Sequence, residues 1–138
     1  MSQRHTWKKA EKLKSRKLID RVFKQGKSFS LFPYRVYFLI HPPGAGVSPT
    51  SPAGAFAPVQ AGFGASSRNF KKAVDRNRIK RLGREAYRLQ KQPLLDRVKE
   101  KGSSMAVFFI YTGKELPEYK MVTEKIGVAL QKIIKEIA

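Results

Sequence analysis

The chemically most distinctive residues of this chain are cationic side chains gathered in one run, Arg76-Asn77-Arg78-Ile79-Lys80-Arg81. Between positions 68 and 91 there are ten Lys or Arg residues and only two acidic ones, Asp75 and Glu85. Guanidinium and ammonium groups bind phosphates, and an asparagine amide both donates to and accepts from a base edge or a 2′-hydroxyl. The chemistry that this stretch predicts is the binding of a polyanion.

The spacing of the same stretch is helical. At about 100° per residue, four apolar residues share one arc of a helical wheel: Ile79, Leu82, Ala86 and Leu89. The other arc holds the polar and cationic residues Arg76, Asn77, Lys80, Arg81, Arg84 and Arg88. Like charges four residues apart repel by a few tenths of a kcal/mol per pair, so ordinary solvated faces mix signs. A solvated basic face is the plain alternative, but the unbalanced charge favours a polyanion surface.

The sequence contains no arrangement typical of a protein-borne catalytic or metal centre. Its two histidines, His5 and His41, have no partner nearby in the sequence, and the acidic residues are scattered among basic ones. The glycines of Gly62-Phe63-Gly64 lack the lysine and hydroxyl residue of a phosphate-binding loop. We therefore predict no catalytic residue and no metal ligand in this chain.

Composition points to the same kind of partner. The 138 residues include 29 Lys or Arg and 10 acidic residues, a formal net charge of +19, and no cysteine. Such an excess fits a partner with many negative charges, nucleic acid or an anionic membrane. Nucleic acid is favoured, and a membrane is not expected, because the apolar arc of the basic helix lacks Trp or Phe. With neither a secretory signal nor a transmembrane segment expected, we predict a cytoplasmic protein.

The length predicts a single domain, residues 1–138, with one modest core. Residues 1–14 are expected to form a flexible basic arm, and residues 42–58, rich in Pro, Gly, Ala and Ser, a flexible loop. A first helix begins after Ser15 and ends at Gly26. The following strands are predicted at 28–32, 34–40 and 59–66, the basic helix at 72–92 with Pro93 limiting it, a buried strand at 105–111 and an amphipathic helix at 117–138. This order predicts an α+β sandwich.

These residues resemble a known family, the protein subunit of bacterial ribonuclease P. The resemblance lies in AVDRNRIKR at 73–81 followed by REAYR at 84–88, in LKSR at 13–16 and in RVFKQGKS at 21–28. The last strand and the closing helix also fall where that family has them. The resemblance covers most of the chain except the arm and the loop.

The resemblance implies a fold and a function. The fold is a single-domain α-β-β-β-α-β-α sandwich with a left-handed βαβ crossover, ribosomal protein S5 domain 2-like. The function is to bind the catalytic RNA of ribonuclease P and the 5′ leader of precursor tRNA, so that the leader is removed by magnesium-dependent hydrolysis. The chemistry would belong to the RNA, which would also bind most of the Mg²⁺.

The resemblance also assigns residues. The RNA-binding set is Arg68, Lys71, Lys72, Arg76, Asn77, Arg78, Lys80, Arg81, Arg84 and Arg88. A cleft for the single-stranded leader is lined by Ile19, Phe23 and Tyr37. Three places depart from the family pattern. Before the basic helix, this chain has Arg68, Asn69 and Lys71, with an apparent extra residue, where the family usually has a lysine pair and a glycine. Ile19 stands where an aromatic residue is usual, and Gly83 where an aliphatic one is usual, at a cost of about 1 kcal/mol relative to alanine.

Three other functions remain as alternatives. A ribosomal protein would share the size, the charge and the lack of catalytic groups. A DNA-binding regulator would need a second short helix just upstream of the basic helix, which the sequence does not show. A self-sufficient nuclease would need a carboxylate cluster, which is also missing.

Overall fold

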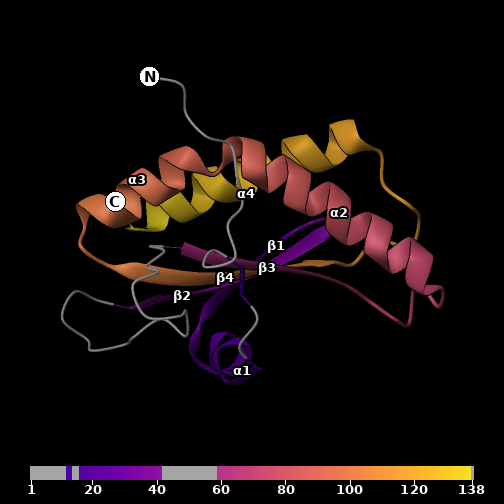
Figure 1. Cartoon of the computed structure of the whole chain (residues 1–138), viewed down its shortest axis with the longest axis horizontal. Helices are drawn as coiled ribbons and strands as arrows, with labels where there is room; N and C mark the ends of the chain where they lie inside the picture. The colour runs from indigo at the N-terminus through magenta and orange to yellow at the C-terminus, as the bar shows by residue number, and fades with distance from the viewer. Residues whose placement is uncertain (1–11, 14–15, 42–58, 138) are drawn as a thin grey trace.

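The structure is a computed structural model that describes residues 12–13, 16–41 and 59–137. Within these residues the elements follow in the order α-β-β-β-α-α-β-α, which has one helix more than the predicted order (Figure 1). The elements are α1 (Arg16–Gln25), β1 (Lys27–Leu31), β2 (Tyr34–His41), β3 (Val59–Ala65), α2 (Ala73–Gln90), α3 (Gln92–Glu100), β4 (Ser104–Tyr111) and α4 (Tyr119–Ile137).

The four strands form one mixed sheet in the order β1-β2-β4-β3. The pairs β1/β2 and β2/β4 are antiparallel, whereas β3 and β4 are parallel and are connected through α2 and α3. The register places Tyr37 of β2 and Gly62 of β3 on either side of Phe108 of β4. The predicted α+β fold class is confirmed, and the left hand of its crossover stays a prediction from the resemblance.

Successive strand residues point to opposite sides of the sheet. Both faces carry apolar residues, and helices cover both. Figure 1 shows α2, α3 and α4 on one side of the sheet and α1 on the other. The larger core lies under the three helices and includes Val36, Phe38, Val107, Phe109, Ile79, Ile126 and Ile133. The smaller one lies under α1 and consists of Leu13, Val22 and Ala106, with Leu18, Ile19, Tyr37, Leu39 and Phe108 packed against it.

The first helix ends as its sequence predicts. A Cβ at Gly26 would lie 2.6 Å from the carbonyl oxygen of Phe38, so only glycine lets the chain turn this close to β2. Of the predicted arm, the structure describes Lys12 and Leu13. Leu13 is buried, and its N–H donates to the carbonyl oxygen of Ala61 over 2.9 Å at the edge of β3. The rest of the arm and the predicted loop 42–58 lie outside the described residues.

The basic helix ends at Gln90, just before Pro93, which limits it as predicted. The sequence prediction did not include the next helix, α3, in which Pro93 occupies the first turn, where its missing N–H costs nothing. One prediction about the basic helix is wrong. Leu89 is not on the buried side, since 44% of its surface is exposed. The residues that α2 buries are Ile79, Gly83, Ala86 and Tyr87.

Candidate nucleic-acid interface

Helix α2 presents polar and cationic side chains to solvent along the side away from the sheet. Asn77, Arg78, Arg81 and Arg84 are exposed, and Lys80 is half-buried. Packing of Ile79, Gly83 and Ala86 against the sheet fixes this orientation, since these residues recur at helical spacing. Five residues of the predicted RNA-binding set therefore lie on one helix and can reach a polyanion.

Arg76 does not belong to this exposed set, contrary to the sequence prediction. It precedes Ile79 by three residues and Gly83 by seven, which places it toward the buried side of the helix. Its guanidinium Nη1 donates to the carbonyl oxygens of Phe70 and Lys71, over 2.7 and 2.8 Å. Arg76 therefore fastens the loop that precedes α2 to the first turn of the helix.

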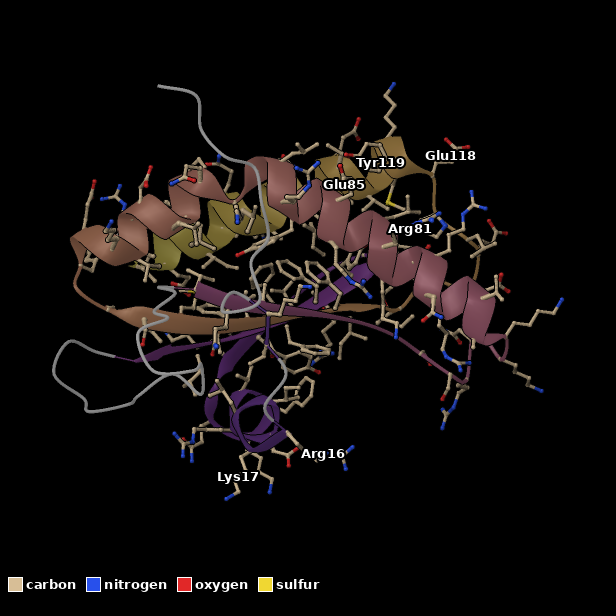
Figure 2. All side chains as sticks on the ribbon, in the orientation of Figure 1. Arg16, Lys17, Arg81, Glu85, Glu118 and Tyr119 are labelled. Carbon is tan, nitrogen blue, oxygen red and sulfur yellow. The ribbon has the colours of Figure 1, made fainter. Side chains whose placement is uncertain are left out.

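Arg88, at the other end of the predicted set, is held by an ion pair within α2. Its Nη2 lies 2.5 Å from Oε1 of Glu85, and its Nε donates to Oε2 over 3.2 Å. The hydrogen bond from Arg88 lowers the pKa of the Glu85 carboxyl and raises the pKa of the guanidinium. Figure 2 shows Arg81 and Glu85 on α2, Tyr119 at the start of α4 and Glu118 just before it. The carboxylate thus offsets part of the positive charge at this end.

The loop before α2 carries the remaining three members of the predicted set. Arg68, Lys71 and Lys72 are all exposed. Between them, Asn69 uses its side-chain Nδ2 to donate to the carbonyl oxygens of Thr112 and Gly113, over 3.2 and 3.3 Å. This loop is therefore attached to the end of β4, and its cations lie next to the N-terminal end of the basic helix.

The three predicted leader-cleft residues come together on the other face of the sheet. Phe23 of α1 keeps 38% of its surface exposed, and its ring meets that of Tyr37 edge-on at a centroid distance of 4.8 Å. Ile19 is half-buried and packs against the same small core as Tyr37. An exposed phenyl ring supported by a second ring can stack on an unpaired base.

Sequence reasoning missed two members of this surface. The ring of Phe108 packs edge-on to Phe23 at 5.4 Å, and Cζ of Arg35 lies 5.6 Å from the ring centroid of Tyr37. The sheet register explains both, because Tyr37 is opposite Phe108, and Arg35 shares its face two residues earlier. The nearly continuous apolar run of β4 concealed which of its residues face α1.

Within the described residues, no three His, Cys, Asp or Glu side chains gather in a group that could hold a metal ion. In the same part of the chain, none of the helices combines the length and the apolar character needed to cross a membrane.

Fold and surface together define the class of this protein. It is a small, strongly basic α+β domain with a cationic helix on one side of a four-stranded sheet and, on the other, an aromatic cluster in which Phe23 is exposed. Comparison with known proteins then identifies the family.

The family model for Ribonuclease P matches residues 7–134. A ribonuclease P protein component from Porphyromonas gingivalis is 33% identical over 130 residues, which are 94% of this chain and 85% of the relative. That from Chlorobium phaeobacteroides is 32% identical over 133 residues, covering 91% and 86% of the two chains. The chain therefore belongs to the ribonuclease P protein family, as its sequence motifs predict.

Solved structures show the same fold. The ribonuclease P protein of Staphylococcus aureus superimposes with a TM-score of 0.65 at 20% identity, covering 94% of this chain and all of that one. The protein from Thermotoga maritima gives a TM-score of 0.62 at 22% identity, with 88% of this chain and 96% of that one covered. Membership of this family implies a part in tRNA processing and an RNA partner.

Proposed function

We propose that this protein binds the catalytic RNA of ribonuclease P through α2 and the 5′ leader of precursor tRNA through the aromatic surface beside α1, and so promotes magnesium-dependent removal of the leader in the cytoplasm. The observation that supports this most strongly is the exposure of Asn77, Arg78, Arg81 and Arg84 on one helix of a family member with a net charge of +19. The proposal includes no membrane partner.

The catalytic RNA is assigned to α2 because that helix carries an array of exposed cations that includes Arg78, Arg81 and Arg84. Each protein cation that neutralises a phosphate releases condensed counterions, which favours binding and makes it depend on salt. Asn77 adds an amide among the cations that can donate to or accept from a base or a 2′-hydroxyl. Arg68, Lys71 and Lys72 would extend the contact along the preceding loop.

The leader is assigned to the opposite side of the sheet because aromatic contact suits an unpaired strand. Phe23 and Tyr37 would offer ring faces or edges to bases, and Ile19 would add apolar contact where the family usually has an aromatic residue. The guanidinium of Arg35, already over the Tyr37 ring, would lie close enough to meet a leader phosphate. Stacking of this kind contributes about 1 to 3 kcal/mol per base.

The hydrolysis itself is assigned to the RNA partner. The side chains of α2 and of the aromatic surface bind and orient, and the described residues include no group of carboxylates, histidines or cysteines suited to a metal ion. The Mg²⁺ in this proposal is therefore bound mainly by RNA, and cations on the protein reduce the phosphate repulsion that opposes its binding.

The test is cleavage of a precursor tRNA at low Mg²⁺ by a bacterial ribonuclease P RNA, with the protein, without it, and with the protein alone. Cleavage that requires both components supports the proposal. A protein that leaves a competent RNA unchanged would instead fit a ribosomal or other structural RNA-binding role. Cleavage by the protein alone would mean that its own side chains catalyse the hydrolysis.

A further inference from the structure

A pocket of about 530 Å³ lies at the end of the sheet, between the β1–β2 turn and the β4–α4 loop. Neither the exposed cations of α2 nor the aromatic surface beside α1 takes part in it. Its lining residues are Phe32, Pro33, Tyr111, Thr112, Gly113, Lys114, Glu115, Met121 and Lys125.

The walls of this pocket are fixed by hydrogen bonds. The carbonyl oxygen of Pro33 accepts from the N–H of Thr112 over 2.7 Å and from its Oγ1 over 3.0 Å, which joins the β1–β2 turn to the end of β4. Tyr111 donates its hydroxyl to the carbonyl oxygen of Glu115 over 2.7 Å. A Cβ at Gly113 would lie 2.6 Å from that hydroxyl, so a glycine is needed for the loop to close over Tyr111.

The chemistry of the lining combines an aromatic ring with cations. Phe32 leaves 74% of its surface exposed, although it is a large apolar side chain, and Lys114 and Lys125 belong to the same lining. A phenyl ring stacks on a nucleobase, and ammonium groups bind the phosphates on either side of it. Glu115 repels phosphate, but its carboxylate can accept hydrogen bonds from the N–H groups of a base.

We propose that this pocket binds one unpaired nucleotide of the catalytic RNA, with the base stacked on Phe32 and the flanking phosphates near Lys114 and Lys125. This inference rests on the proposed function. It identifies a contact that is separate from both the basic helix and the leader surface.

Two observations favour RNA over a peptide or a lipid as the occupant. The net charge of +19 selects a polyanion, and two of the cations that make up this charge, Lys114 and Lys125, line the pocket with one carboxylate, Glu115. The pocket is also continuous with the proposed RNA-binding surface, because Asn69 in the loop before α2 donates to the carbonyl oxygens of Thr112 and Gly113. Figure 1 shows the β4–α4 connection rising from the sheet at the end of the molecule where α2 begins. An RNA strand bound at Arg68 and Lys71 therefore has a short path to the pocket.

The experiment measures the affinity of the full-length protein for a bacterial ribonuclease P RNA over a series of salt concentrations. Phe32→Ala is expected to weaken binding roughly tenfold, the effect of losing one stacked base, without changing the salt dependence. Phe32→Tyr should restore the affinity, because it restores the ring. Lys114→Ala should instead reduce the slope of log affinity against log salt by about one. With 4-thiouridine in the RNA, ultraviolet light should cross-link a nucleotide to Phe32.

Val128→Ala is the matched control, since Val128 is an exposed apolar residue of α4 outside the pocket. It should bind RNA like the original protein. Unchanged affinity in Phe32→Ala, together with no cross-link at Phe32, would overturn the pocket assignment. So would a loss confined to precursor tRNA, because the occupant would then not be the catalytic RNA. If the original protein does not stimulate cleavage by the RNA at all, the proposed function fails first, and the two failures are thereby distinguished.

Discussion

At the scale of single residues, Gly83 shows a family departure that the structure explains. A Cβ at this position would lie 2.9 Å from Cδ2 of Phe63. The Phe63 ring is itself stacked on Phe109 at 5.1 Å and meets Tyr87 at 5.8 Å, so it has little room to move. The glycine lets α2 approach the sheet closely enough for this aromatic cluster to form. The glycine lowers the helix propensity of α2, but the packing of these rings requires it.

Gly83→Ala should therefore destabilise the protein, although alanine normally stabilises a helix interior relative to glycine. We expect the free energy of unfolding in urea to fall by about 1 to 2 kcal/mol, because an extra carbon forces a packed ring aside. The matched control is the same substitution in a Phe63→Leu background, where the ring is gone and alanine should stabilise. If Gly83→Ala stabilised the original chain, the Phe63 ring would have to move aside at little cost, contrary to this prediction.

Tyr34, with its buried hydroxyl, is a second single residue that leads to a prediction, here for the pH dependence of folding stability. Its side chain is 3% exposed, and among the described residues its hydroxyl has no hydrogen-bond partner. Burial, and to a lesser extent the neighbouring Tyr111, raise the pKa of Tyr34 above its ordinary value. A raised pKa in the folded state means that the contribution of Tyr34 is complete below about pH 10 and is lost as the pH rises beyond that value.

Tyr34→Phe should remove this alkaline sensitivity. At pH 8 the substitution should leave the free energy of unfolding unchanged or raise it, because it removes a buried polar group without a partner. Above about pH 10 the variant should become progressively more stable than the original protein, by up to about 1.4 kcal/mol per pH unit. Urea unfolding at pH 8 and pH 11 measures both. Parallel losses in the two proteins would assign the alkaline effect to other groups, Tyr111 among them.

At the scale of elements, α2 combines two kinds of arginine that sequence alone does not separate. Arg76 donates to the carbonyl oxygens of Phe70 and Lys71, whereas Arg84 is exposed to solvent. Arg76→Ala should lower the free energy of unfolding by about 1 to 2 kcal/mol, because hydrogen bonds from a charged group are lost. Arg84→Ala should leave stability unchanged and reduce the salt dependence of RNA binding by about one unit of slope.

The comparison is read from urea unfolding and from RNA affinity measured at several salt concentrations. Arg78→Ala serves as a second exposed variant and should behave like Arg84→Ala. Equal stability losses at positions 76 and 84 would contradict the distinction drawn from the hydrogen bonds. An unaltered salt slope in both exposed variants would remove α2 from the proposed RNA interface.

The elements themselves were largely predictable from the sequence. Gly26 ends α1, the apolar run of β4 forms a central strand, and α2 follows the helical spacing around Ile79. The helix α3 was missed because Pro93 stops a helix at its preceding residue in one context and begins a helix in another. Hydrophobic periodicity cannot decide whether Pro93 ends one helix or begins the next. The outcome depends on the burial of Leu94 and Val98, which α3 provides.

The candidate site was less predictable than the fold, for reasons of geometry. The helical wheel places Arg76 in the basic arc, at its border next to Ile79, and it cannot show that carbonyl groups of the preceding loop accept from this side chain. Phe108 and Arg35 enter the aromatic surface only through the register between β2 and β4. The register depends on how one strand pairs with another, so it cannot be derived from the sequence of either strand alone.

At the scale of the whole molecule, the sheet separates the two surfaces that the proposed function uses. Helix α2 lies on one side of the sheet and α1 on the other (Figure 1). The exposed cations belong to α2, and the rings of Phe23 and Tyr37 meet on the α1 side. Figure 2 shows Arg16 and Lys17 projecting from α1 on that second side, so each surface has cations of its own. One domain can thereby contact two RNA segments at once, and substitutions on opposite faces share no partner.

This separation predicts which substrate each substitution affects. Phe23→Ala should weaken binding of precursor tRNA to the assembled ribonucleoprotein by about 1 to 3 kcal/mol, the contribution of one stacked base, and leave mature tRNA unaffected. Arg84→Ala should instead weaken assembly of the protein with the catalytic RNA. Measured at saturating catalytic RNA, the loss of precursor affinity caused by Phe23→Ala should be the same with and without Arg84→Ala, because the effects of distant sites add within about 0.5 kcal/mol.

Leu89→Ala, an exposed apolar substitution on α2, is the control. It should change neither the affinity for precursor tRNA nor the assembly of the protein with the catalytic RNA. Equal losses for precursor and mature tRNA in Phe23→Ala would mean that the aromatic surface contacts something other than the leader, and the assignment of one RNA segment to each face of the sheet would fail.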